Sequence, residues 1–453
     1  MRRSNSNPYS PHTNEDRREM LAAIGVRSID DLITAIPADA RRPTLGLPAG
    51  MSEAEVQAHL ESLAAKNRPA SAGPFFLGGP VQRRYIPAAV PALAFRGEFL
   101  TAYTPYQPEV SQGTLQSVFE YQSLMSELLA MEIVNSSMYE GGSAVAEAAF
   151  MAVRVTGRKK VVIADSVYFQ YRRVLRAYGR GPDLEIVEAA ANDLASRVDG
   201  AACVIVQHPD AFGGIVDVRS LVDAAHVAGA LLVQVTEPHA CALLEPPGAL
   251  GADIVAGEGQ PLGIPMSYGG PHLGILACRE ALVRQMPGRI VGETRDVNGV
   301  RGFVNTLQTR EQHIRREKAT SNICTNEAIA AIVAAVYLAL LGPEGLRSAA
   351  RLGVARAHAL AARLARIPGC AVANEGAYFD RFALRAPGGG FALGWRLLRE
   401  AGIIAGDATL DHYPGRDDLI VQCTEMTTEA EMDAFVEAVT RIVASTREPV
   451  AAG

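Results

Sequence analysis

The residues best suited to chemistry form a short polar stretch ahead of a long predicted helix. The stretch consists of Tyr103, Thr104, Pro105, Tyr106 and Gln107. Its proline restricts the backbone, and its two tyrosyl hydroxyls and its amide can form hydrogen bonds with a small polar substrate. We therefore predict that this loop contributes to an active site. The alternative is a buried polar loop that braces an interface and touches no substrate.

A second candidate site opens the next predicted helix. Gly141, Gly142 and Ser143 come directly before a small-residue helix that is expected over 144–155. Free N–H groups at a helix N-terminus bind phosphate and other anions, so this turn could hold a phosphate. A nucleotide turn or simple close packing would use the same residues. The turn lacks the Gly-x-Gly-x-x-Gly spacing, which argues against a dinucleotide fold.

Alternating helices and strands along the middle of the chain must position both segments. Strands are expected at 160–164, 184–187, 201–206, 231–235 and 254–255, and helices at 112–131, 168–178 and 220–228. The strands are apolar throughout, which is typical of a parallel sheet covered by helices on both faces. The pattern therefore predicts an α/β fold.

The flanking segments predict smaller units. Residues 1–18 are polar and are expected to form an exposed arm, and the short amphipathic helices up to residue 66 could bury little surface alone. These helices are expected to pack on the main body or on another subunit. Residues 280–324 show little helix or strand signal before 310. Helices are expected at 326–341 and 343–366, followed by alternating strands and helices. The predicted domains are an N-terminal helical segment (1–95), a large α/β domain (96–325) and a small C-terminal α/β domain (326–453).

Composition excludes several classes of protein. The chain of 453 residues has a net charge of -6, which disfavours nucleic acid as a partner. It contains no run of 18 apolar residues, so no membrane span is expected, and its N-terminus lacks the apolar core of a secretory signal. Six cysteines lie far apart without metal-ligand spacing. We expect buried thiols in a cytoplasmic protein and no metal site.

Longer segments identify a family. The glycine turn, the predicted sheet and the smaller C-terminal domain together suggest a fold-type I enzyme dependent on pyridoxal phosphate (PLP). Five segments closely resemble the P-protein of the glycine cleavage system, and more narrowly the N-terminal half of those P-proteins that are split into two chains. These segments are Phe99–Glu109, Ser111–Gln116, Gly257–Gly263, Gln308–Lys318 and Ala319–Thr325.

This resemblance implies a complete reaction scheme. The large domain would be built on a mostly parallel seven-stranded sheet, and the chain would pair with a second P-protein subunit as a heterodimer or a dimer of heterodimers. The pair would bind glycine through PLP, release CO2 and transfer the aminomethyl group to the lipoyl group of the H-protein. A cytoplasmic enzyme without membrane or nucleic-acid partners is implied.

The chain departs from the pattern of a PLP site at several positions. Such a site needs a Schiff-base lysine, an anion cradle and a carboxylate facing the pyridine nitrogen. The strand-end Asp-x-x-His motif is replaced by Thr236-Glu237-Pro238-His239, and the expected lysine is absent because none occurs between Lys160 and Lys318. The late-strand arginine that holds a substrate carboxylate in many relatives corresponds to Gln422. We therefore expect PLP on the partner subunit and not covalently on this chain.

The remaining candidates have open alternatives. The cradle at Gly141, Gly142 and Ser143 is either retained for an anion or vestigial. Lys318 could form a Schiff base, reach the partner's phosphate or form a structural ion pair, and its charged neighbours disfavour the first role. The nearby arginines could face the H-protein or brace an interface; they are Arg310, Arg315 and Arg316.

Expectations also concern two histidines and two alternative functions for the chain. His239 would stack on a cofactor ring if one were bound, and is otherwise expected to be a packed core residue. His208 ends a predicted strand, near the edge where α/β sites form. The competing functions are a non-catalytic scaffolding or regulatory relative, and a self-sufficient PLP enzyme that uses Lys318.

Overall fold

The computed structural model describes residues 12–41, 46–321, 323 and 325–447. The chain divides into two compact units, residues 1–68 and 69–453. The first unit contains α1 (Asn14–Ile24) and α2 (Glu53–Ala64), both opened by capping boxes, at Thr13 and at Ser52. These helices confirm the predicted amphipathic elements. Neither helix has a residue that is buried in this chain, so what covers them stays a prediction.

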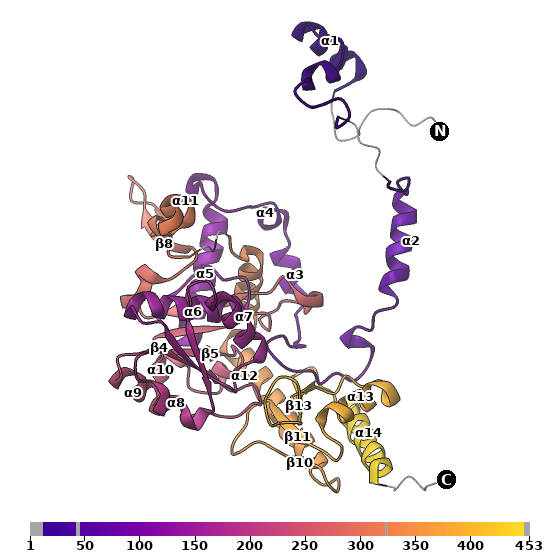
Figure 1. The fold of residues 1–453 in the computed structure, drawn as a ribbon, viewed down its shortest axis with the longest axis vertical. Coiled ribbons are helices and arrows are strands. Elements are labelled where there is room, and N and C mark those ends of the chain that lie inside the picture. Colours follow the sequence, from indigo (N-terminus) through magenta and orange to yellow (C-terminus); the bar gives the residue numbers. More distant parts are fainter. Residues whose placement is uncertain (1–11, 42–45, 322, 324, 448–453) are drawn as a thin grey trace. The chain divides into compact units, whose positions relative to one another are not determined.

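A seven-stranded sheet forms the centre of the second unit (Figure 1), with the strand order β1-β7-β6-β5-β4-β2-β3. Its strands are β1 (Ile133–Val134), β2 (Lys160–Ala164), β3 (Glu185–Ala189), β4 (Ala201–His208), β5 (Leu231–Thr236), β6 (Ile254–Glu258) and β7 (Gly274–Cys278). The strands from β3 to β6 run parallel, whereas β7 is antiparallel to both β6 and β1. The prediction of a mostly parallel sheet is confirmed.

Helices cover this sheet and connect its strands. They are α5 (Gln112–Leu129), which packs on β1, and α6 (Gly141–Thr156), α7 (Phe169–Gly179), α8 (Leu194–Arg197), α9 (Val218–Val227) and α10 (Pro247–Leu250), which lie between strands. Two short helices, α3 (Ala89–Ala94) and α4 (Gly97–Leu100), come before them in the chain. The small residues of α6 allow it to lie close to β4, β6 and β7. All residues of β4 and β6 are buried, as expected for strands covered on both faces.

The segment after β7 contains structure that the sequence pattern did not reveal. A hairpin is formed by β8 (Ile290–Arg295) and β9 (Arg301–Thr306), followed by α11 (Gln312–Arg315). The prediction of little regular structure before residue 310 was therefore wrong. The buried residues of this hairpin are Ile290, Val291 and Phe303. Ile290 packs in the main core, and Val291 and Phe303 lie in a small cluster with residues of α5, so the apolar alternation of the hairpin is weak. The pair Asn298-Gly299 was the available hairpin signal.

The C-terminal part has its own core. Its four-stranded sheet contains β10 (Ala371–Val372), β11 (Arg381–Arg385), β12 (Asp407–Ala408) and β13 (Leu419–Gln422), and its helices are α13 (Gly390–Ala401) and α14 (Glu429–Arg447). Long helix α12 (Ala328–Leu364) is kinked at Gly342, where φ is 58°. Its first half packs in the main core and its last turns in the C-terminal core. The predicted boundaries at 95/96 and 325/326 stay predictions.

Helix α12 is also apolar enough to be compared with a membrane span. Within the described part of the chain, it is the one helix whose length and hydropathy would permit crossing, and 44% of its most apolar window is buried inside the chain. Core helices of soluble proteins share these properties. The burial of Ala330–Ala335, Tyr337 and Leu338 in the main core supports that interpretation.

Candidate functional site

The polar loop of residues 103–107 lies between α4 and α5 and is open to solvent. Tyr103 is 74% exposed and Tyr106 is 54% exposed, whereas Pro105 is buried. The loop turns tightly, because the Tyr106 N–H donates to the Thr104 carbonyl at 2.8 Å. Its phenol rings are therefore displayed on the surface of this chain, on a backbone that is itself fixed.

One buried arginine holds the middle of this loop. Arg289, which is 5% exposed, donates from Nη1 to the Thr104 hydroxyl at 3.3 Å and from Nη2 to the Tyr106 hydroxyl at 3.4 Å. Its guanidinium also lies over the Tyr106 ring, 5.4 Å from the centroid. Asn305 adds a hydrogen bond of 2.9 Å to the Pro105 carbonyl. Nothing in the loop sequence pointed to Arg289, which lies in a distant glycine-rich segment.

A cavity of about 240 Å³ adjoins the loop. It is lined by residues of the loop region, including Tyr103 and Thr104, and by residues just before and at the start of α12, including Asn326. Asn326 also accepts a hydrogen bond from Arg289 at 3.4 Å. The loop and this cavity therefore share their supporting residues.

The glycine turn at the start of α6 is occupied by carboxylates of the chain itself. Glu140 caps the helix, accepting from the Gly142 N–H at 2.5 Å and from the Ser143 N–H at 2.8 Å. Glu258, at the end of β6, accepts from the Gly141 N–H at 3.0 Å. Burial raises the pKa of Glu258 to about 7. All three N–H groups that could cradle a phosphate therefore already donate to carboxyl oxygens of the chain.

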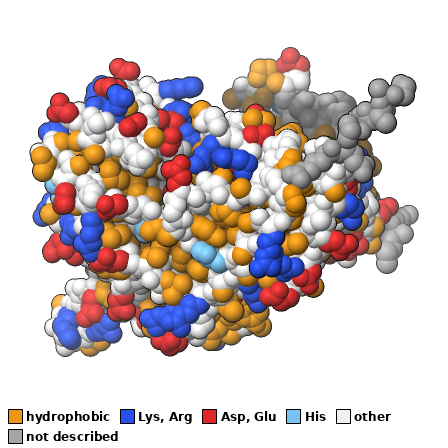
Figure 2. Space-filling view, turned by 90° about the horizontal axis from the view of Figure 1, so that it is seen from below, with side chains coloured by type: hydrophobic (Ala, Val, Ile, Leu, Met, Phe, Trp, Pro, Cys, Tyr) orange, Lys and Arg blue, Asp and Glu red, His pale blue; other side chains and the backbone are white. Residues whose placement is uncertain are grey.

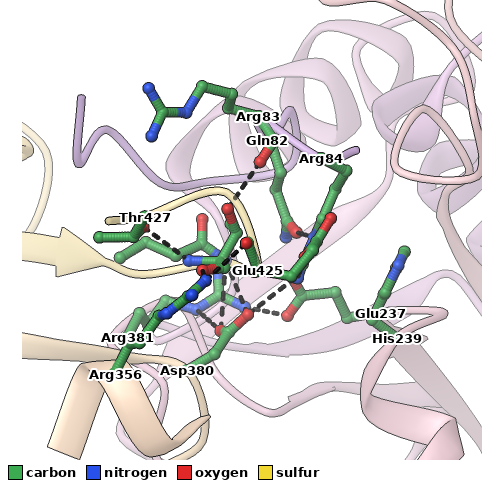
Figure 3. A network of polar contacts seen from close by, with 12 residues as sticks. Gln82, Arg83, Arg84, Glu237, His239, Arg356, Asp380, Arg381, Glu425 and Thr427 are labelled. Atoms are coloured by element: carbon green, nitrogen blue, oxygen red, sulfur yellow. Dashed lines mark hydrogen bonds and ion pairs between the residues drawn. The ribbon is translucent and has the colours of Figure 1, made fainter. Parts of the chain in front are cut away.

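A network of buried charges fills the space between β5, β11 and the end of β13 (Figure 3). Arg381, which is fully buried, pairs with Glu237 and donates to the Tyr168 hydroxyl. Arg84 pairs with Asp380 at 2.8 Å and with Glu425 at 2.9 Å. Gln422, in the predicted place of a substrate-binding arginine, donates to Asp380 at 3.2 Å.

The close approach of the backbone to Arg381 shows how tightly this region is filled. Gly213 has a φ of +88°, and a Cβ there would lie 2.1 Å from the Arg381 carbonyl oxygen. Only glycine satisfies both conditions. Burial raises the pKa of Glu237 to about 7, while Arg381 and Arg84 oppose that shift. The region is thus a dense polar core in which each guanidinium faces carboxylates.

His239 and Gln260 are packed core residues. His239 is fully buried, and its Nε2 lies 3.2 Å from the Tyr337 hydroxyl. Burial holds its pKa well below the usual range. Gln260, in the stretch where a lysine was expected, donates to the Ile264 carbonyl at 2.6 Å and accepts from the Gln82 N–H at 2.8 Å. The environment of His239 agrees with the expectation of a packed histidine.

Of the four lysines of the sequence, Lys66 belongs to the first unit and the other three belong to the second. Lys159 and Lys160 stand at the amino end of β2 and donate to the carbonyls of Pro182 and Asp199. Lys318 is exposed in the turn Arg316–Lys318, with no ion-pair partner among the described residues. An exposed ammonium lacks the low-dielectric setting that imine formation needs.

The other predicted residues have structural contacts. Arg310 is buried and donates to the carbonyls of Leu307, Met286 and Gly288. Arg315 donates to the Thr309 carbonyl at 3.0 Å, and Arg316 is exposed. His208 accepts from the Val216 N–H at 3.1 Å and is 7% exposed. These contacts favour a structural role for Arg310 and His208, in which each side chain braces nearby backbone groups.

A cavity of about 520 Å³ lies at the carboxyl ends of β2, β3 and β4 and is lined by none of the predicted site residues. Its walls include Asp165, Asp210 and Arg416. Burial raises the pKa of Asp210 to about 6. We place the candidate site at the loop and not at this cavity, because the loop presents several exposed hydrogen-bonding groups on a fixed backbone.

Comparisons with known proteins agree with this geometry. The model of the family "Glycine cleavage system P-protein" matches residues 7–439. A probable glycine dehydrogenase (decarboxylating) subunit 1 of Thermomicrobium roseum is 50% identical, over 95% of this chain and 98% of the relative. A protein of the same name from Xanthobacter autotrophicus is 49% identical, over 96% of this chain and 100% of the relative.

Solved structures extend the likeness to the fold. An inhibitor-bound glycine decarboxylase (P-protein) of the glycine cleavage system superimposes with a TM-score of 0.89 at 44% identity, covering 96% of this chain and 100% of that one. A cysteine desulfurase from Thermococcus onnurineus shares the fold alone, with a TM-score of 0.60 at 16% identity over 88% of this chain and 100% of that one. The predicted fold-type I architecture of PLP-dependent enzymes is confirmed. By family match, identity over nearly its whole length and structure, this chain belongs to the P-protein family of the glycine cleavage system.

Proposed function

We propose that this chain is the first subunit of a two-chain glycine decarboxylase. With a second P-protein subunit it would bind glycine through PLP, release CO2 and pass the aminomethyl group to the lipoyl group of the H-protein. The observation that carries this proposal is the 50% identity to a relative named as subunit 1, matched over 98% of its length. The assembly would be a heterodimer or a dimer of heterodimers in the cytoplasm.

We propose further that the working PLP is held by the partner subunit. The residues of this chain do not fit the cofactor, because Glu140 and Glu258 occupy the N–H groups of the phosphate cradle. Arg381 and its carboxylate partners fill the region beside His239 (Figure 3). Gln260 takes part in backbone hydrogen bonds where a lysine would be needed. On this proposal the cradle of Gly141, Gly142 and Ser143 is vestigial as an anion site.

The contribution of this chain would be its exposed loop. In the proposed complex, Tyr103, Thr104, Tyr106 and Gln107 enter the site of the partner subunit and orient glycine by hydrogen bonds. The Tyr106 hydroxyl accepts a hydrogen bond from Arg289, so its own hydrogen can be donated to a substrate oxygen. PLP on the partner would supply the electron sink for decarboxylation.

Exposed apolar surface supports a partner. Figure 2 shows apolar side chains gathered over much of one face, between side chains of both charge signs. Near the loop, Leu100 is 55% exposed and Val110 is 79% exposed. Large exposed apolar areas mark interaction surfaces in soluble proteins. The second P-protein subunit is the proposed occupant of the surface around Leu100 and Val110.

The test is reconstitution of the two-chain complex. Mixed with a partner that carries the PLP lysine, this chain should restore glycine–bicarbonate exchange, and the complex should contain one PLP per heterodimer. Failure to restore exchange with an assembled partner would favour the scaffolding alternative. A borohydride-stable PLP adduct on Lys318 of the isolated chain would favour the self-sufficient enzyme.

The loop is tested by Tyr106→Phe in the assembled complex. Loss of one hydrogen bond to a charged substrate costs about 1.5–3 kcal/mol, so kcat/KM for exchange should fall about 10- to 100-fold without loss of assembly. Tyr178→Phe is the matched control, because Tyr178 is 40% exposed on α7 and its ring stacks on Phe150. An unchanged rate in Tyr106→Phe would remove this hydroxyl from the site.

A further inference from the structure

Arg289 joins the candidate loop to two separate segments of the chain. Its Nη1 lies 3.3 Å from the Thr104 hydroxyl and 3.4 Å from the Asn326 side-chain oxygen, just before α12. Its Nη2 lies 3.4 Å from the Tyr106 hydroxyl, and its Nε lies 3.7 Å from a carboxylate oxygen of Glu311. The buried guanidinium thus joins the loop to α12 and to the segment after β9.

The contacts of Arg289 divide the loop into held and displayed side chains. Thr104 and Tyr106 are held by the guanidinium, and the Tyr106 ring also meets His313 edge-on at 6.3 Å. Tyr103 and Gln107 are exposed, and neither side chain makes a hydrogen bond within the part of the chain that the structure describes. The middle of the loop is therefore fixed from beneath, and its two ends face outward.

We propose that Arg289 is a positioning residue that holds the loop of residues 103–107 in the shape in which it enters the partner subunit's site. This inference rests on the proposed function and adds a residue to it. Arg289 touches no substrate on this proposal. It acts through Thr104 and Tyr106, to which it presents two nitrogens of one rigid plane.

The role requires arginine rather than any cation. The planar guanidinium presents separate donors to Thr104, to Asn326 and to Tyr106, while Nε faces Glu311. The single ammonium of lysine cannot reach all of these acceptors at once. The flat guanidinium also lies over the Tyr106 ring, a geometry that arginine favours.

The test compares Arg289→Lys with Arg301→Lys in the assembled two-chain enzyme. Arg301 is the matched control, because it pairs with Glu293 within the same hairpin and lies over Phe303 without contacting the loop. A loop displaced by about 1 Å can cost about 100-fold in rate, so we expect Arg289→Lys to lower kcat/KM for glycine–bicarbonate exchange about 10- to 100-fold. Arg301→Lys should retain the wild-type rate.

A second readout separates positioning from general damage. Amide hydrogens of residues 103–107 should exchange with deuterium faster in Arg289→Lys, while the complex keeps its stoichiometry. A double variant, Arg289→Lys with Tyr106→Phe, should be no more than about threefold slower than the worse single variant, because one residue acts through the other. If Arg289→Lys does not assemble, Asn326→Leu removes an acceptor of Arg289 that lies outside the loop, without a change of charge, and should lower the rate at least threefold.

The outcomes distinguish this inference from the function on which it rests. A wild-type rate in Arg289→Lys beside a slow Tyr106→Phe would overturn positioning by Arg289 and leave the loop in the site. Rate losses of the two single variants that multiply in the double variant would also overturn positioning by Arg289. Wild-type rates in both single variants would reject the role of the loop itself, and with it the proposed function of these residues.

Discussion

Replacement of Arg381 by methionine should destabilise this chain more than any surface change. The arginine is fully buried, pairs with Glu237 and donates to the Tyr168 hydroxyl. Removal of one partner from a buried ion pair typically costs about 3–5 kcal/mol, because the other charge is left without compensation. With unfolding entropies of about 2 cal/mol/K per residue, a unit of this size should lose roughly 4–6 °C in melting temperature.

The pH dependence of that loss identifies its cause. Burial already raises the pKa of Glu237 to about 7. A carboxyl whose pKa is raised by folding contributes stability below its unfolded pKa and loses it as pH rises through the folded pKa. Without Arg381 the folded pKa of Glu237 should rise further. The melting temperature of Arg381→Met should therefore fall further below wild type at pH 8 than at pH 5.5.

Calorimetry of the full chain at the two pH values provides the assay. Arg219→Met is the control, because Arg219 is 57% exposed and its pair with Glu245 should contribute at most about 1 kcal/mol. The double variant Arg381→Met with Glu237→Gln should recover part of the loss, since both charges are then absent. A loss below about 1 kcal/mol, or one equal at both pH values, would refute the interpretation of this region as a compensated ionic core.

Three further predictions concern the cradle and the exposed lysine. Glu258→Gln should narrow the difference in melting temperature between pH 5.5 and pH 8. Burial raises the pKa of Glu258 to about 7, so the wild type loses the stability that protonated Glu258 contributes as pH rises. An unchanged difference in melting temperature would contradict this. Gly141→Ala should cost about 1–3 kcal/mol in urea unfolding, since the new Cβ would lie 2.2 Å from the Tyr171 hydroxyl oxygen. Gly113→Ala, with no atom within 4 Å, should cost nothing. Lys318→Met should leave the PLP content of the two-chain complex unchanged. A halved PLP absorbance of the complex would show that Lys318 binds the cofactor.

The main sheet could be predicted because its signal is local and strong. The apolar strand residues 161–164 and 201–208 are all buried, so composition alone identifies these strands. The hairpin of β8 and β9 escaped prediction because only Ile290, Val291 and Phe303 are buried in it. A strand that packs through one residue, or through two adjacent residues, has almost no periodic pattern to detect.

Only part of the candidate site could be predicted from the sequence. The loop at 103–107 is marked by its own composition, but its anchor Arg289 lies more than 180 residues away and sits in a glycine-rich stretch. The same holds for Arg84 and Asp380, which are paired across 296 residues. Contacts between side chains so far apart depend on how the elements pack, and composition carries no record of that packing.

The chain's two candidate sites have opposite electrostatic states, and this difference decides their roles. At the start of α6, the helix N-terminus faces Glu140 and Glu258, so an incoming phosphate would have to displace a carboxylate from its N–H donors. At the loop, Arg289 compensates Glu311 from beneath, while Tyr103 and Gln107 keep free hydrogen-bonding capacity on the surface. A polar group that already has a hydrogen-bond partner inside the chain gains little free energy from a ligand. A group that is fixed in place and has no such partner gains most. Ligand contacts are therefore expected at the loop, which supports the proposal that the partner subunit holds the cofactor.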